Sequence, residues 1–355
     1  MDDDIQDSYI NDIRTNFKGV TFSNFKKTDV IKQLIISLNE TKLEPSIYWS
    51  VELICSGNFL CLWDLIIQFY SKYIQIGNSK LIIYIDICYD KFKNIINGYS
   101  NELLLRNNSN IRKLFAEMIS ILCLSKKHHI FQEIKINIDD FIITNITEKL
   151  KAPNVSYIEK YYKKDDPKSL FIPFNEFVYN LDIKNHIESC YWFEYILNYE
   201  INVKKKNITC SCEKRTFMNI NVKFQTDIIW IFWEIILDYA KTKGVLYTKI
   251  INSALNLFCI QYNNTFKKKR KYLLYFSITL LNINIIMDNE IVKEKHIITN
   301  VIQKINKIYS QVKKNELSPN TDYLFSDIDK HKNIEKTIKR LDLLNTFEND
   351  FIPRL

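Results

Sequence analysis

The chain has 355 residues, of which 46% are hydrophobic, and 49 Lys and Arg against 41 Asp and Glu give a formal net charge of +8. This length can fill a sizeable core, and the modest positive charge permits contact with nucleic acid or acidic surfaces without requiring it. Only 5 Gly and 6 Pro leave little material for a many-stranded sheet or a phosphate-cradling loop, so the composition favours an all-α fold.

Membrane insertion and secretion are both disfavoured by the sequence. The apolar stretch 228–237 is broken by Glu234, and no apolar run reaches membrane-spanning length. The start, Met1-Asp2-Asp3-Asp4, is acidic where a secretory signal is basic and then apolar. We therefore expect a protein of a reducing compartment whose cysteines are mostly buried small hydrophobes, including Cys55, Cys61, Cys88, Cys123 and Cys259.

The first half of the chain predicts a polar, loose N-terminal arm over 1–26 and a five-helix layer over 27–125. Apolar residues at helical spacing mark its helices. Pro45 near a helix start and Gly57 after a helix end fit the usual helix boundary signals. The expected helices carry Val30 to Leu38, Pro45 to Cys55, Trp63 to Tyr70, Leu81 to Ile96 and Ile111 to Leu124.

A connection over 126–173 precedes a second layer over 174–288, which contains a basic, cysteine-bearing insertion at about 203–220. The remainder, 289–355, predicts a helix at about 290–315 and a polar tail with a short helix near 333–345. Helices of the second layer are expected around Phe174 to Leu181, Tyr191 to Leu197, Ile228 to Tyr239, Tyr247 to Ile260 and Lys271 to Ile286.

The two layers share sequence features that suggest a duplicated helical unit. Tyr48-Trp49 matches Tyr191-Trp192 at an offset of 143 residues, which also pairs Ser46 with Ser189. The segment 62–72 further resembles 232–242, and 112–115 resembles 270–273. We therefore predict two tandem, related multi-helix layers.

Aromatic pairs are the strongest local signal, because adjacent helical residues point about 100 degrees apart and can serve either the core or a partner. Packing within the core is the favoured interpretation. The carboxylates near these rings, Glu52, Asp64, Glu194 and Glu234, are expected at the polar edges of amphipathic helices. The candidate interaction or core aromatics are Tyr48, Trp49, Trp63, Tyr191, Trp192 and Trp233.

A structural zinc site is a less favoured alternative. His186 and Cys190 lie four residues apart, and the insertion adds Cys210 and Cys212. Cys-x-Cys is less usual than Cys-x2-Cys among zinc ligands, and Cys190 can equally be a buried core residue. The expected protein therefore carries no cofactor, with this zinc site as the open exception.

Basic clusters provide the candidate nucleic-acid surface. Their local density suits phosphate contact, although solvated lysines in a lysine-rich chain would look the same. The candidates are Lys204, Lys205, Lys206, Lys214, Arg215, Lys267, Lys268, Lys269, Arg270 and Lys271.

The stretch 44–57 and the segment Cys210-Ser211-Cys212-Glu213-Lys214-Arg215 resemble uncharacterised proteins of giant nucleocytoplasmic DNA viruses. Residues 34–77, with Tyr48-Trp49 followed by Gly57 and then Ile76-Gly77, also look like the helical C-terminal region of clamp-loader-related AAA+ ATPases. The first likeness implies a viral protein in the host cytoplasm or nucleus. The second implies subunit association, without the ATPase core or any catalytic residue.

The sequence favours a non-catalytic helical scaffold with protein partners or self-association, and the two likenesses imply a place in a viral replication or repair assembly. Motifs for nucleotide binding and for serine or zinc hydrolases are absent from the sequence. Two alternatives stay open: direct binding of DNA or RNA through the basic clusters, and a structural role in the virion.

Overall fold

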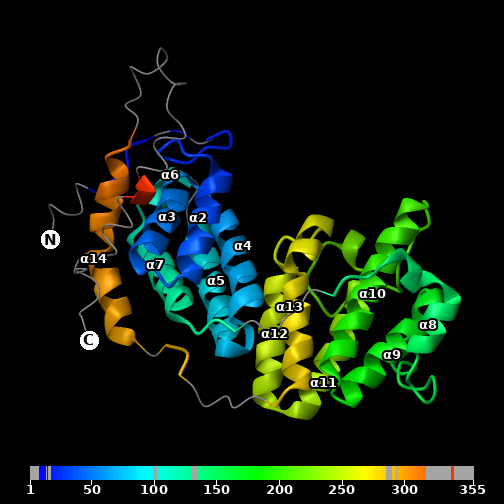
Figure 1. The fold of residues 1–355 in the computed structure, drawn as a ribbon. Coiled ribbons are helices and arrows are strands. Elements are labelled where there is room, and N and C mark those ends of the chain that lie inside the picture. The colour runs from blue at the N-terminus through cyan, green and yellow to red at the C-terminus, as the bar shows by residue number, and fades with distance from the viewer. Residues whose placement is uncertain are drawn as a thin grey trace. The chain divides into compact units, whose positions relative to one another are not determined.

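The protein is built from helices, as the computed structural model shows (Figure 1). The structure describes residues 8–12, 14, 17–98, 102–128, 134–284, 290–292, 294–316 and 337–339. Within these residues the only strand-like pairing is an isolated bridge between Val20 and Lys26. The predicted all-α fold is therefore confirmed.

The chain divides into two compact units. The first comprises Met1–Asn78, Ile87–Lys127 and Glu290–Leu355, and the second comprises Ser79–Asp86 and His128–Asn289. The helices of the first unit are α2 (Lys27–Asn39), α3 (Leu43–Cys55), α4 (Phe59–Phe69), α6 (Glu102–Arg106), α7 (Ser109–Leu124) and α14 (Lys295–Lys313).

Helix α5 (Leu81–Asn97) begins in the second unit and ends in the first. The second unit otherwise holds α8 (Ile143–Lys149), α9 (Phe171–Asp182), α10 (His186–Lys205), α11 (Ile229–Lys243), α12 (Val245–Cys259) and α13 (Asn264–Asn282). Short helical turns complete the described fold at Tyr70–Ile74, Gln75–Asn78, Ile138–Phe141, Lys168–Leu170 and Val222–Phe224.

Helix α14 belongs to the first unit, although the second unit precedes it in the chain. It lies against α3 and α7 (Figure 1), and it buries an apolar stripe of Ile297, Val301, Ile305 and Ile308. The Arg112 guanidinium sits 3.8 Å from the centre of the Tyr309 ring. The sequence places α14 in a region of C-terminal helices and tail over 289–355, and the structure shows that its apolar stripe supplies part of the core of the first unit.

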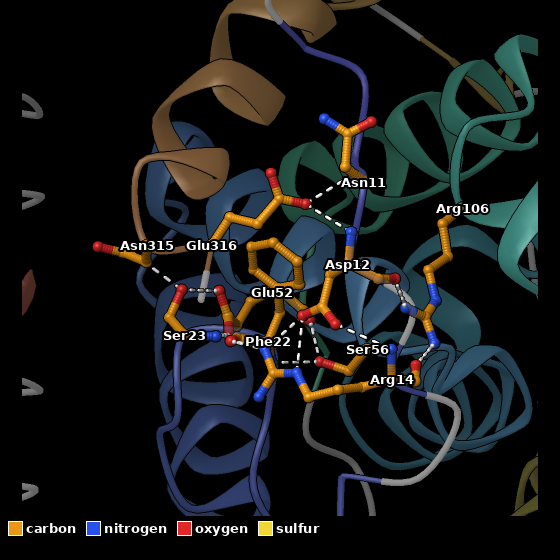
Figure 2. Close-up of polar contacts among 10 residues, drawn as sticks. All are labelled: Asn11, Asp12, Arg14, Phe22, Ser23, Glu52, Ser56, Arg106, Asn315 and Glu316. Atoms are coloured by element: carbon orange, nitrogen blue, oxygen red, sulfur yellow. Dashed lines mark hydrogen bonds and ion pairs between the residues drawn. The ribbon is translucent and has the colours of Figure 1, made fainter. Parts of the chain in front are cut away.

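The described part of the N-terminal segment is anchored, which corrects the expectation of a loose arm. Three aromatic side chains, Phe17, Phe22 and Phe25, are buried. Figure 2 shows the polar contacts beside them: Ser23 donates from its backbone N and its Oγ to the Glu52 carboxylate, at 2.6 and 2.8 Å. Burial of these aromatic rings offsets the conformational entropy lost when the segment is ordered, which a purely polar segment could not do.

Residues after α14 join the same cluster (Figure 2). The Glu316 Oε1 accepts from the backbone N atoms of Asn11 and Asp12, at 2.6 and 2.7 Å, and Asn315 donates to the Ser23 Oγ at 3.0 Å. Ser23 thus links the residues that follow α14 to Glu52 of α3. The short helix expected near 333–345 lies outside the described residues except for 337–339.

Two helical hairpins share a turn at the offset seen in the sequence. Thr41 between α2 and α3 has φ of 59°, and Lys184 between α9 and α10 has φ of 58°. Lys42 N donates to Ser37 O at 2.9 Å, as Asn185 N does to Asn180 O at 2.8 Å. A left-handed residue after the last helical turn closes many helices, so the shared turn does not by itself establish the duplication.

Candidate anion-binding pocket of the second unit

A pocket of about 1010 Å³ opens within the second unit, beside α10 and α13. The two helices pack against each other (Figure 1), and residues 134–137 form the remaining wall. Six lysines and two glutamates line it, so its charge is strongly positive. The lining residues are Ile134, Lys135, Ile136, Asn137, Glu194, Leu197, Asn198, Glu200, Ile201, Lys204, Lys205, Asn264, Lys267, Lys268 and Lys271.

Local sequence places these lysines at two helix ends. Lys204 and Lys205 complete the last turn of α10, where positive side chains complement the negative end of the helix dipole. Helix α13 begins under the Asn263 cap, whose side chain accepts from the backbone N atoms of Thr265 and Phe266. Lys267 and Lys268 follow in the opening turns of α13, where positive charge is unfavourable unless anions compensate it.

Buried carboxylates compensate part of this charge. Glu200 accepts from the Nζ atoms of Lys204 and Lys267, both at 2.6 Å, and Lys267 also donates to Asp227 at 2.5 Å. Burial alone would lower the pKa of Lys267, but Asp227 and Glu200 raise it above its usual value. Burial alone would raise the pKa of Asp227, but the charge and hydrogen bond of Lys267, together with hydrogen bonds from the Ile229 backbone N and the Tyr262 hydroxyl, lower it below its usual value. Lys267 is thus a charged structural residue.

Glu194 organises a second group of contacts in the pocket. Its Oε1 accepts from the Lys271 Nζ and from the Tyr275 hydroxyl, both at 2.6 Å. Its Oε2 accepts from the Asn198 amide at 3.3 Å. The expectation that Glu52 and Glu194 lie at polar helix edges is therefore wrong, because both are buried and each gathers several donors.

Three lysines of the pocket keep their charge available. Lys135, Lys205 and Lys268 are exposed. Within the described residues, no carboxylate forms an ion pair with any of them. An entering anion would meet these three ammonium groups without first displacing a carboxylate, which the other three pocket lysines would require.

The structure divides the candidate basic residues of the sequence into three sets. Lys204, Lys205, Lys267, Lys268 and Lys271 line the pocket. Lys206, Lys214 and Lys269 are exposed outside its lining. Arg215 and Arg270 are buried.

The two buried arginines hold the protein together. Arg215 donates to both carboxylate oxygens of Asp166 and to Glu234. Arg270 donates to the backbone carbonyls of Phe258 and Ile260. Their charges are satisfied inside the fold, so neither guanidinium faces solvent where a phosphate could reach it.

Sequence reasoning missed Lys135 as a pocket residue. Its segment lies in the expected connection and carries no basic cluster, and the charge of Lys135 joins the others only because residues 134–137 lie beside α10 and α13. No local pattern in the sequence signals that placement.

The candidate aromatics are mostly core residues. Trp49, Trp63, Trp192 and Trp233 are fully buried, and Tyr48 is buried beside Trp49. The Trp63 ring packs against Tyr89, Phe92 and Phe115 at centroid distances of 5.3, 5.6 and 5.3 Å. Tyr191 is half-buried, and its hydroxyl accepts from the Lys149 Nζ at 2.8 Å. Core packing, the favoured interpretation, therefore accounts for the tryptophans.

The four candidate zinc ligands are not gathered. His186 Nε2 lies 3.6 Å from Cys190 Sγ and 2.8 Å from the Thr279 hydroxyl, while the Cys212 thiol donates to the Asp227 carbonyl at 3.2 Å. Cys210 is buried. Among the described residues, no three His, Cys, Asp or Glu side chains are grouped as a metal site requires.

Comparisons with known proteins return no matching family model, no matching curated protein and no matching solved structure. Across the described residues, none of the helices combines the length and the apolar character needed to span a bilayer.

Proposed function

We propose that the second unit binds nucleic acid through the phosphate backbone, at the pocket beside α10 and α13. Of the functions expected from the sequence, this is the one that a described site supports. The observation that carries it is the convergence of six lysines from three chain segments on one hollow, and three of these lysines form no ion pair with a carboxylate among the described residues. Phosphate contacts by lysine supply most of the sequence-independent affinity for nucleic acid.

The pocket's internal ion pairs strengthen this proposal. Glu200 and Glu194 hold Lys204, Lys267 and Lys271 in place and compensate their charge. The positive charge left for a ligand therefore comes from the exposed Lys135, Lys205 and Lys268. The α13 N-terminus contributes further positive potential, because Asn264 of its first turn lines the same pocket. A phosphate chain therefore meets a pocket with a positive net charge.

The test is a pair of charge reversals, Lys205→Glu with Lys268→Glu, compared with the wild type by fluorescence anisotropy on labelled DNA and RNA across a salt series. Loss of two phosphate contacts lowers the slope of log affinity against log salt by about 1.4 to 1.8. The matched control is Lys249→Glu, an exposed lysine of α12 outside the pocket.

The outcomes separate the alternatives. Weakened binding in the double variant with unchanged binding in Lys249→Glu supports the proposal. A loss in Lys249→Glu about half that in the double variant means that only overall charge matters, because the control reverses one charge against two, and this rejects the pocket. No binding of any nucleic acid by the wild type rejects the function itself, and the mass of the same preparation then tells whether the chain associates with itself.

A further inference from the structure

The lysine-rich pocket also has an apolar wall. Leu197 and Ile201 of α10 line it together with Ile134 and Ile136. Aliphatic side chains contribute nothing to phosphate binding, and a site that only tracks a duplex backbone needs none. Their position inside a charged pocket indicates a ligand with an apolar part next to its phosphates.

The pocket is large enough to enclose that part. Its volume of about 1010 Å³ reaches the upper end of the roughly 300–1,000 Å³ range of pockets that bury small ligands. A nucleobase has flat apolar faces and a polar edge, and in a duplex these faces are stacked against neighbouring bases. Only an unpaired nucleotide can bring them to a protein wall.

Polar groups at the wall suit the edge of a base. Asn198 donates its amide N to Glu194, which leaves its Oδ1 able to accept from an exocyclic amine. Asn264 is exposed and lines the same pocket. Amide side chains that both donate and accept can pair with the Watson–Crick edge of an unstacked base.

Resting on the proposed nucleic-acid function, we infer that the pocket accepts an unpaired nucleotide, so that the protein prefers single-stranded DNA or RNA to duplex. The base lies against Leu197 and Ile201, and its flanking phosphates meet Lys135, Lys205 and Lys268. The charged residues supply attraction to any strand, while the apolar wall supplies the preference.

The experiment compares one labelled strand, alone and annealed to its complement, on the wild type and on Ile201→Ser. The Ile201 side chain is 39% exposed, so this neutral change leaves the core intact. We expect the wild type to bind the single strand at least about tenfold more tightly than the duplex, and Ile201→Ser to lose about fivefold on the single strand alone, because it removes an aliphatic contact with the base.

The matched control is Ile187→Ser, because Ile187 lies on the same helix, is 72% exposed and does not line the pocket. It should change neither affinity. Equal binding of single strand and duplex overturns the inference and leaves the proposed function standing. A single-strand preference that Ile201→Ser does not reduce also overturns it, since the base would then bind elsewhere. Absence of all binding rejects the proposed function instead.

Discussion

Arg215 and Asp166 form a fully buried, bidentate ion pair, with Nη1 to Oδ1 at 2.5 Å and Nη2 to Oδ2 at 2.7 Å. The guanidinium also donates to Glu234 at 3.0 Å and to the Tyr161 carbonyl at 3.1 Å. One arginine of the insertion thereby holds the segment before α9 and the α11 helix in a single arrangement within the second unit.

Removing this guanidinium should destabilise the second unit. Arg215→Met leaves the buried Asp166 charge without its partner, and we expect the free energy of unfolding to fall by about 3–5 kcal/mol. Urea denaturation followed by tryptophan fluorescence measures the change. The neighbouring exposed residue provides the control: Lys214→Met should stay within about 0.5 kcal/mol of the wild type. A loss below 1 kcal/mol for Arg215→Met would contradict the structural role given to this pair.

Lys267 and Lys268 are neighbours in sequence with opposite roles. Lys267→Met leaves the buried Asp227 without its ammonium partner and Glu200 with Lys204 alone, so the free energy of unfolding should fall by about 3–5 kcal/mol. Lys268→Met removes an exposed charge and should change that free energy by no more than about 0.5 kcal/mol while weakening nucleic-acid binding. Denaturation and anisotropy on both variants test this contrast, and equal stability losses would refute it.

Glu52 should make the stability of the first unit depend on pH. Burial raises the pKa of its carboxyl above the ordinary value of 4.5, despite the hydrogen bonds from Ser23 that lower it. Between the unfolded and folded pKa values the folded state binds more protons, so stability falls as pH rises through this window. Glu52→Gln should therefore remove a decline in stability above pH 4.5 that the wild type shows.

Thermal unfolding of both proteins over a pH series checks the Glu52 prediction. Glu148→Gln, which removes the same charge from an exposed position, serves as the control and should follow the wild type. The prediction is wrong if the stability difference between Glu52→Gln and the wild type stays constant across the series.

The two left-handed turn residues offer a stabilising change. Thr41 and Lys184 have φ of 59° and 58°, a conformation that costs a residue with a side chain about 1–2 kcal/mol. Glycine relieves that cost but gains freedom in the unfolded chain, so Thr41→Gly and Lys184→Gly should each add about 0.5–1 kcal/mol of stability. In contrast, Lys32→Gly at an exposed position inside α2 should lose about 1 kcal/mol. Calorimetry shows whether the free energy of unfolding rises or falls in each variant.

Much of the secondary structure could be predicted from the sequence, because helices follow local periodicity and boundary residues. The helix carrying Val30 to Leu38 is α2, and the one carrying Pro45 to Cys55 is α3, which ends just before Gly57. Trp63 and Trp233 are buried as core aromatics. Apolar side chains at helical spacing must be covered by something, so their burial follows from the pattern alone.

The partners of those helices could not be predicted in the same way. The apolar stripe of α14 shows that one face is covered, but only the fold places that face against α3 and α7. The N-terminal segment is polar on average and so does not predict burial, yet three of its phenylalanines pack into the core of the first unit. Contacts between residues about 300 positions apart, such as Asn11 with Glu316, leave no local trace in the sequence.

Local patterns along the chain are enough to indicate the helical class and the dense positive charge at 204–206 and 267–271. Which of those charges can meet a ligand depends on how the chain folds. Lys267 is buried between two carboxylates, whereas Lys268 lines the pocket without an ion pair to any described carboxylate and Lys135 joins it from a distant segment. The physical reason is that helical pattern and charge are properties of neighbouring residues, while burial and ion pairing depend on groups that folding brings together.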